Sequence, residues 1–290
     1  MIFEEIPDLK RDVTLSGYST FSVGGPADFF VDVREVSLLP DILDAAREAN
    51  IPTFILGGGS NVLFKDEGFR GLIIRLLADS IEIDGERMTI EAGARWPAIH
   101  RAAAEAQLTG LEAFQGLPGT MGGAVAGNAG CFGTETADVL ESARIYDPES
   151  GEVLTWTCDD FDYRYRWSRL KEQPGVVLSA TLKLATLQAD TPEHDMDSQR
   201  ARLMKQPPGR SSGSFFKNPS SEQPAGMLID QCGLKGLKIG GAQISPKHGN
   251  FFMNMGGATA ADLLALRDRA VAAVQEKFGL TLKEEVVIVG

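Results

Sequence analysis

The alternation of hydrophobic and polar positions predicts a β-α-β unit near the start of the chain. Residues 29–33 and 53–56 are short apolar runs of the kind found in strands. Between them, residues 38–50 repeat their apolar positions at the spacing of a short amphipathic helix. A strand, a helix and a second strand in this order form a β-α-β unit.

Further elements are predicted along the rest of the chain. Residues 71–76 are apolar and β-branched, and residues 81–83 and 88–90 flank Asp84-Gly85, a dipeptide typical of a hairpin turn. Pro97 suits the start of a helix over 97–106. Short β segments and turns are predicted between 143 and 184, a helix over 197–205 and a final strand over 285–289.

The clearest helix is predicted over residues 259–278. Thr259 and Asp262 have the spacing of a capping box, in which each side chain bonds the main chain of the other residue. Apolar residues recur along one face of this segment, and Gly279 is suited to end the helix.

The order of these elements predicts an α+β fold. A polar segment, residues 188–198, contains Pro192 and is interpreted as the main connection between domains. We expect two lobes of one domain, residues 1–78 and 79–196, followed by a C-terminal α+β domain, residues 197–290.

Composition narrows the classes of function. The 290 residues are 43% hydrophobic and carry a formal net charge of -12, so the chain is a poor candidate for coating nucleic acid or an anionic membrane. The three cysteines lack CxxC or zinc-type spacing, which indicates a reducing, cytoplasmic compartment. No signal peptide is visible in residues 1–11, and no apolar run is long enough to span a bilayer.

Two glycine-rich segments carry the strongest chemical indication. The first, residues 57–61, follows a predicted strand, where glycines let main-chain amides approach an anion. Taken alone, it fits a structural turn and a phosphate-binding nest equally well. The second, residues 116–130, has too many small residues for ordinary turns, so contact with a planar ligand is the favoured interpretation.

Together with other segments, these two resemble the UDP-N-acetylenolpyruvoylglucosamine reductase family, also called UDP-N-acetylmuramate dehydrogenases. The resemblance follows the family's order over nearly the whole chain, and GSFFKNP with GLPGTMGGAV is its most specific pair. The matching segments are FSVGGPAD (21–28), LGGGSNVLFKDEGFRG (56–71), GLPGTMGGAVAGNAG (116–130), YRWS (165–168), GSFFKNP (213–219), GGAQIS (240–245) and EVVIVG (285–290).

The resemblance implies a two-lobed FAD-binding domain of the vanillyl-alcohol oxidase (PCMH) type, followed by a substrate-binding domain. It implies non-covalent FAD, NADPH as the hydride donor, a sugar nucleotide substrate, and a cytoplasmic step of peptidoglycan precursor synthesis. We expect the protein to be a monomer. Some family members carry a loop with a tyrosine that covers the substrate. Residues 178–188 contain no tyrosine, so this chain resembles the type that lacks the loop.

The implied reaction adds hydride to one carbon of a C=C bond and a proton to its neighbour, which requires a cation near the substrate carboxylate and a proton donor. The family motifs select Arg166 as the cation, Ser214 as the proton donor and Glu285 as an electrostatic partner or acid. By chemistry alone, each of the three has competitors nearby in the sequence. Arg164 competes with Arg166, because both lie on the same face of a predicted strand, and Ser211 and Ser212 compete with Ser214. Glu284 competes with Glu285 but is predicted to point away from the site. We expect the substrate to raise the pKa of Glu285.

The remaining candidate residues bind cofactor or substrate, and no group of His, Cys, Asp or Glu has metal-ligand spacing. The expected substrate ligands are Tyr165, Lys217, Asn218, Gln243 and Arg202. Asn254 fits a substrate contact and a loop cap equally well. The expected FAD ligands are Gly57, Gly58, Gly59, Ser60, Asn61, Pro118, Gly119, Thr120, Gly122, Gly123, Ala124, Asn128 and Ala129.

Two other functions compete with the reductase. Another FAD oxidoreductase of the same fold, such as a sugar or alcohol oxidase, explains the glycine segments but not GSFFKNP, YRWS or the terminal EV motif. A non-catalytic sugar-nucleotide-binding protein explains the fold but not the presence of Arg166, Ser214 and Glu285 together.

Overall fold

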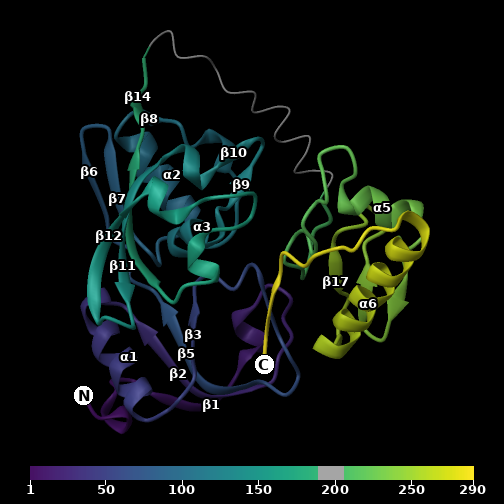
Figure 1. Cartoon of the computed structure of the whole chain (residues 1–290), viewed down its shortest axis with the longest axis horizontal. Helices are drawn as coiled ribbons and strands as arrows, with labels where there is room; N and C mark the ends of the chain where they lie inside the picture. Colours follow the sequence, from purple (N-terminus) through teal and green to yellow (C-terminus); the bar gives the residue numbers. More distant parts are fainter. Residues whose placement is uncertain (189–205) are drawn as a thin grey trace. The chain divides into compact units, whose positions relative to one another are not determined.

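The computed structural model describes residues 1–188 and 206–290 (Figure 1). The chain divides into two compact units, which are described separately below. The first comprises Met1–Lys10, Phe29–Gly58 and Gly71–Gln199, and the second comprises Arg11–Asp28, Gly59–Arg70 and Arg200–Gly290. The division falls inside three strands, β1 (Lys10–Thr14), β2 (Pro26–Val33) and β5 (Phe69–Leu76).

The predicted β-α-β unit is confirmed. Strand β2 is followed by helix α1 (Leu39–Glu48) and strand β3 (Thr53–Leu56), and the sheet has the order β1-β2-β5-β3. Strand β3 pairs in parallel with β5, and residues 57–68 form the crossover connection that two parallel neighbours need. Pro40 lies in the first turn of α1, and the buried face of the helix includes Leu39, Ile42 and Leu43.

A second sheet of the first unit is antiparallel and has the order β12-β11-β13-β7-β6. Its strands are β6 (Ile81–Asp84), β7 (Arg87–Glu91), β11 (Leu140–Asp147), β12 (Glu152–Thr157) and β13 (Val176–Lys183). The predicted hairpin is confirmed by the antiparallel pairing of β6 with β7, and Gly85 supplies the positive φ of its turn.

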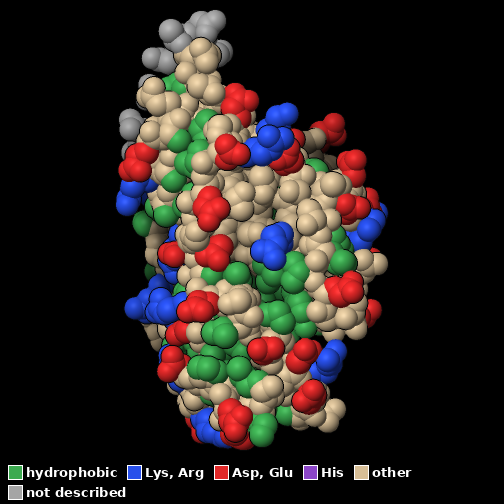
Figure 2. All heavy atoms as spheres, turned by 90° about the vertical axis from the view of Figure 1, so that its left-hand side faces the viewer, with side chains coloured by type: hydrophobic (Ala, Val, Ile, Leu, Met, Phe, Trp, Pro, Cys, Tyr) green, Lys and Arg blue, Asp and Glu red, His purple; other side chains and the backbone are tan. Residues whose placement is uncertain are grey.

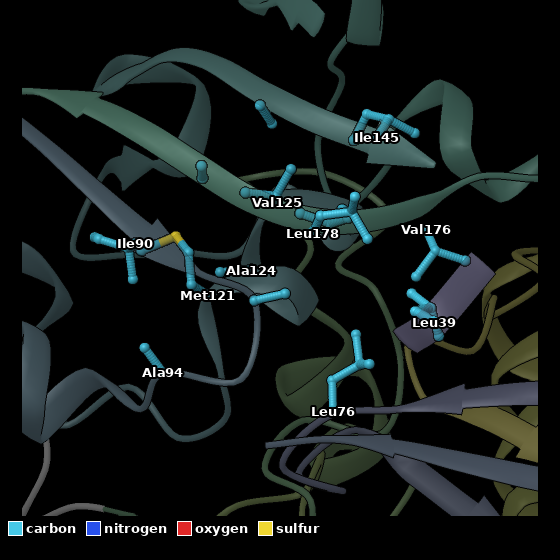
Figure 3. Close-up of a cluster of buried hydrophobic side chains, with 14 of the residues drawn as sticks. Leu39, Leu76, Ile90, Ala94, Met121, Ala124, Val125, Ile145, Val176 and Leu178 are labelled. Carbon is cyan, nitrogen blue, oxygen red and sulfur yellow. The ribbon is translucent and has the colours of Figure 1, made fainter. Parts of the chain in front are cut away.

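Helices α2 (Trp96–Glu105) and α3 (Met121–Gly127) complete the first unit. Met121 and Val125 of α3 lie in one buried apolar cluster with Ile90 of β7 and Leu178 of β13 (Figure 3). The helix predicted over 97–106 corresponds to α2, but residues 116–133 contain α3, which the small-residue composition did not predict. Tertiary packing therefore stabilises a helix that three glycines disfavour.

The second unit contains α5 (Ala225–Gln231), which packs against α6 (Ala260–Phe278), and a sheet with the order β15-β16-β17 (Figure 1). The strands of this sheet are β15 (Lys238–Ile239), β16 (Ala242–Ile244) and β17 (Phe252–Asn254). The final strand is shorter than predicted: β18 (Val287–Val289) pairs in parallel with β4 (Val62–Phe64).

The predicted helix over 259–278 is confirmed as α6. Its capping box of Thr259 and Asp262 is formed, and Gly279 ends the helix with a φ of 69°. The carboxylate of Asp66 adds two hydrogen bonds, from the main-chain amides of Ala260 at 2.8 Å and Ala261 at 2.9 Å. These bonds satisfy amides that a helix leaves without an internal partner at its start.

The remaining described elements are short. The strands are β8 (Leu108–Thr109), β9 (Gly130–Cys131), β10 (Thr134–Glu135) and β14 (Ala185–Thr186). The 3-10 helices are η1 (Phe3–Glu5), η2 (Leu15–Tyr18), η3 (Val36–Leu38), η4 (Glu112–Phe114), η5 (Thr136–Asp138), η6 (Cys158–Phe161) and η7 (Arg169–Lys171). The helix predicted over 197–205 lies outside the described residues.

The surface seen in Figure 2 mixes acidic and basic side chains without a large area of one sign. Across residues 1–188 and 206–290, no helix has both the length and the apolar character needed to cross a bilayer.

Candidate active site

The two glycine-rich segments approach each other closely in the first unit. A Cβ atom placed on Gly58 would lie 2.9 Å from the Cα of Gly119, and one placed on Gly57 would lie 2.5 Å from the Oγ1 of Thr120. Such distances leave no room for a side chain at either position. The glycines at 57 and 58 therefore bring main chain from the two segments together, as the interpretation of a ligand-binding surface requires.

Thr120 lies where the two segments meet. Its side chain is 5% exposed, it is the residue that precedes α3, and its hydroxyl has no hydrogen-bond partner within the described part of the chain. A buried hydroxyl without a partner is costly unless a ligand supplies one. This hydroxyl and the side-chain-free surface of Gly57 and Gly58 fit a cofactor that offers a hydrogen-bond acceptor.

The other residues of the second segment are arranged around α3. Pro118 and Gly119 precede the helix, Gly122, Gly123 and Ala124 lie in its first turn, and Asn128 and Ala129 follow its end. The side chain of Asn128 is already bonded within the protein: its amide donates to Glu135 at 2.7 Å and its oxygen accepts from the main chain of Ala137 at 3.1 Å. Asn128 thus holds its own loop, in a left-handed conformation that Asn tolerates.

The end of α3 is bonded to the segment that carries Arg166. The Tyr163 hydroxyl donates to the carbonyl of Val125 at 2.9 Å, and the Ser168 hydroxyl donates to the carbonyl of Ala126 at 2.7 Å. Burial, with a smaller effect from Cys158, raises the pKa of Tyr163, so its hydroxyl stays protonated and able to donate. The glycine-rich segment and the Arg166 segment therefore form one bonded structure.

The prediction that Arg164 and Arg166 share one face of a strand is wrong. Residues 164–167 form a turn, in which Arg164 and Trp167 exchange both main-chain hydrogen bonds. Arg166 has a φ of 55°, a left-handed conformation that ends any strand-like alternation of side chains. Arg164 instead pairs with Asp162 at 2.5 Å, and its guanidinium lies 4.5 Å from the ring centre of Trp167.

Arg166 is held at one side of its guanidinium. Nη2 donates to the carbonyl of Gly130 at 2.6 Å, and Nη1 lies 3.7 Å from a carboxylate oxygen of Glu135. A Cβ atom on Gly130 would lie 2.6 Å from the Thr134 carbonyl oxygen and 3.1 Å from Nη1, so the main chain at Thr134 is what excludes a side chain at this position. Tyr165 is 45% exposed, and the guanidinium of Arg166 lies 5.1 Å from its ring centre.

In the second unit, three sequence-predicted residues lie on adjoining extended segments. The main-chain amide of Glu285 donates to the carbonyl of Phe215 at 2.9 Å, next to Ser214. The side-chain amide of Asn61 donates to the carbonyl of Glu285 at 3.0 Å, and Gly59 and Ser60 directly precede Asn61. Ser214 and Glu285, distant in sequence, are therefore neighbours through the main chain of Phe215.

Two of the competing residues have other partners. The Ser212 hydroxyl lies 2.9 Å from the hydroxyl of Thr20, and Glu284 forms an ion pair with Arg267 of α6 at 2.8 Å. The carboxylate of Glu284 therefore already has a partner on α6. The family motifs select Ser214 and Glu285, and Ser211 stays an alternative to Ser214 by chemistry alone.

The expected substrate residues have mixed surroundings. The Asn218 side-chain oxygen accepts from the amide of Ala225 at the start of α5, and the Gln243 side-chain amide donates to the carbonyl of Gly236 at 3.1 Å. Lys217 is half-buried, and Arg202 lies outside the described residues.

The Asn254 side chain bonds the main chain of two loops in the second unit. Its side-chain amide donates to the carbonyl of Phe21 at 2.9 Å, and its side-chain oxygen accepts from Gly256 at 2.9 Å. Of the two interpretations of Asn254, a substrate contact and a loop cap, these contacts fit the loop cap.

Sequence reasoning missed Tyr163, Ser168 and Glu135. Ser168 is the last residue of the YRWS motif and Tyr163 precedes the motif by two positions, but the motif gave no reason to link either hydroxyl to α3. Glu135 is remote from Arg166 in sequence, and only the fold places it beside the guanidinium.

Comparison with protein families finds two matches along the chain. Residues 27–157 match the family described as "FAD binding domain". Residues 204–289 match the family described as "UDP-N-acetylenolpyruvoylglucosamine reductase, C-terminal domain". The predicted fold class, an FAD-binding domain followed by a C-terminal α+β domain, is confirmed.

Individual relatives match over nearly the full length. The chain is 40% identical over 287 residues to a UDP-N-acetylenolpyruvoylglucosamine reductase of Clostridioides difficile, covering 98% of this chain and 94% of that protein. It is 36% identical to one from Bacillus velezensis, with 99% and 95% covered. The crystal structure of the reductase from Thermus caldophilus matches with a TM-score of 0.82 and 36% identity, covering 97% of this chain and 99% of that one.

Proposed function

Because the chain belongs to the UDP-N-acetylenolpyruvoylglucosamine reductase family, we propose that it reduces UDP-N-acetylglucosamine enolpyruvate to UDP-N-acetylmuramate with NADPH. This reaction is a step in the synthesis of peptidoglycan precursors. The observation that carries the proposal is the full-length similarity to the reductases, with Ser214 and Glu285 on adjoining segments of one unit.

FAD, when bound, would serve as the carrier of two electrons between NADPH and the substrate. We assign its binding to the predicted residues of the two glycine-rich segments. Gly57 and Gly58 keep the surface clear of side chains, and the Thr120 hydroxyl offers a donor. Binding is non-covalent.

Three side chains serve the addition to the C=C bond. Arg166 binds the substrate carboxylate and stabilises the negative charge that develops there. Ser214 gives the proton of its hydroxyl to the carbon next to the one that receives hydride. Glu285 adds an acid or electrostatic partner at the same carboxylate, where a second negative charge raises the pKa of its side chain.

The finer assignments follow the same proposal. Tyr165, Lys217, Asn218, Gln243 and Arg202 bind the sugar nucleotide. The segment between β13 and residue 188 carries no tyrosine, which supports the type without the substrate-covering loop. We propose lobes 1–78 and 79–196 and a substrate domain 197–290, in a monomer that works in the cytoplasm without nucleic-acid or membrane partners.

A spectroscopic experiment without oxygen tests the function. The purified protein should be yellow, NADPH should bleach the flavin absorbance, and the enolpyruvyl substrate should restore it with formation of UDP-N-acetylmuramate. A bleached protein that the substrate fails to restore, but that oxygen or a sugar acceptor does, supports another oxidoreductase of the same fold. A protein that binds the sugar nucleotide but is inert to NADPH supports a non-catalytic role.

A further inference from the structure

Asn250 makes an unusual set of contacts next to the proposed proton donor. Its side chain is 1% exposed and bonds both main-chain groups of Phe216: its oxygen accepts from the Phe216 amide at 2.9 Å, and its amide donates to the Phe216 carbonyl at 2.8 Å. A single side chain therefore takes the place of a neighbouring strand at Phe216.

The main chain of Asn250 extends the same contact toward Ser214. The Phe215 amide donates to the Asn250 carbonyl at 2.8 Å, and Ser214 pairs with Phe251 in an antiparallel bridge. On the other side of this segment, Phe215 accepts from the Glu285 amide at 2.9 Å and Phe216 pairs with Glu284. The segment that carries Ser214 is thus held between Asn250 and the segment of Glu285.

We propose that Asn250 is a positioning residue for the proton-transfer step, acting through Ser214. The inference rests on the proposed function, which gives Ser214 its role. Proton donation from a hydroxyl to carbon depends on where the hydroxyl is held, because misplacement by about 1 Å can cost about 100-fold in rate. The Asn250 side chain fixes the two peptide groups on either side of Phe216, next to the Ser214–Phe215 peptide group that the Asn250 carbonyl holds.

The chemistry of the contact explains why asparagine is needed. The Phe216 amide requires an acceptor and the Phe216 carbonyl requires a donor, and both lie in a buried region. Only a carboxamide of this length offers both groups in one plane. Aspartate lacks the donor, and alanine leaves both main-chain groups without a partner.

The test compares two variants in the FAD-loaded protein. In Asn250→Asp and Asn250→Ala, NADPH should still bleach the flavin at a rate within about twofold of the wild type. Substrate-driven restoration of the absorbance should slow by about 10- to 100-fold. Its solvent deuterium isotope effect should increase, because proton transfer becomes more rate-limiting.

A double-mutant cycle with Ser214→Ala separates positioning from general loss of structure. If Asn250 acts through Ser214, Asn250→Ala should slow restoration by less than about threefold in the Ser214→Ala background. Full additivity of the two losses would overturn the proposal. Equal slowing of both half-reactions, or failure of both Asn250 variants to fold and hold FAD, would also overturn it, because the role would then be general.

Asn254→Ala provides the matched control. Asn254 is also a buried asparagine of the second unit, but it bonds Phe21 and Gly256 instead of the Ser214 segment. This variant should lose thermal stability while keeping the wild-type ratio of the two half-reaction rates. Failure of the proposed function itself is recognised separately, since the wild-type protein would then show no restoration by the substrate.

Discussion

The side-chain amide of Asn61 donates a hydrogen bond to the carbonyl oxygen of Glu285 at 3.0 Å. The last residue of the first glycine-rich segment is thereby bonded to the segment that carries a proposed catalytic carboxyl group. The contact continues along the chain, because the Val287 amide donates to the Asn61 carbonyl and β18 pairs with β4. Asn61 is thus both a predicted FAD ligand and the residue that holds the main chain of Glu285.

This contact predicts different effects for two substitutions. Asn61→Asp replaces the donor with a carboxylate facing a carbonyl oxygen, so the free energy of unfolding should fall by about 1–3 kcal/mol. Glu285→Gln leaves the Glu285 carbonyl and its hydrogen bond in place, so stability should fall less than in Asn61→Asp while substrate reduction slows. Denaturant unfolding and anaerobic flavin spectroscopy measure the two effects. A stability loss in Glu285→Gln equal to that in Asn61→Asp would contradict this interpretation.

The proton-donor role of Ser214 predicts a loss confined to one half-reaction. Ser214→Ala should leave the reduction of bound flavin by NADPH nearly unchanged, because no proton is donated to carbon in that step. Restoration of the flavin absorbance by the enolpyruvyl substrate should slow by about 100- to 10,000-fold. Stopped-flow absorbance follows each half-reaction separately. Ser212→Ala is the control, since that hydroxyl contacts Thr20; a larger effect there than at Ser214 would reassign the donor.

The buried hydroxyl of Thr120 predicts opposite effects on cofactor binding and on protein stability. Thr120→Val removes a polar group that has no partner within the described part of the chain, so the FAD-free protein should be as stable as the wild type or more stable. Loss of a donor to FAD should raise the dissociation constant of the cofactor about 5- to 100-fold. Fluorescence titration with FAD and thermal unfolding of the FAD-free protein measure the two quantities.

Thr136 provides a control for this experiment. Its buried hydroxyl donates to the carbonyl of Ala129 at 2.8 Å, so Thr136→Val should lower stability. If Thr120→Val behaves like Thr136→Val and leaves FAD affinity unchanged, the Thr120 hydroxyl does not contact the cofactor.

Elements with local sequence determinants were the ones predicted correctly. The capping box and the glycine at the end of α6 are both contained in the segment that they delimit, and the turn at Gly85 lies between its own two strands. Helix α3 lacks such determinants. Its start is held by bonds to remote main chain, from Met121 to Ala94 and from Gly122 to Ala92, which a local pattern does not contain.

The candidate site was only partly predictable for the same reason. Motifs identified Arg166, Ser214 and Glu285, but the turn at Arg166 has no glycine or proline to reveal it, and a positive φ at arginine is uncommon. The partners that hold these residues, such as Glu135 for Arg166 and Asn250 for the Ser214 segment, are distant in sequence. Glu and Asn are common polar residues that no motif marks here, and only the tertiary fold brings them next to the residues they hold.

The bond from Tyr163 to the end of α3 predicts a pH-dependent contribution to stability. Tyr163→Phe leaves the buried Val125 carbonyl without this donor, so the free energy of unfolding at neutral pH should fall by about 1–2 kcal/mol. Burial raises the pKa of Tyr163 above its ordinary value of about 10, so only the unfolded chain ionises this residue just above that pH. The wild type should therefore lose stability as pH rises past about 10, and its advantage over Tyr163→Phe should shrink.

Denaturant unfolding between pH 7 and about 11 measures both effects. The control is Tyr165→Phe, because the Tyr165 side chain is 45% exposed; this variant should stay within about 0.5 kcal/mol of the wild type at neutral pH. A constant gap between wild type and Tyr163→Phe across that range would show that the phenol ionises equally in the folded and unfolded chain.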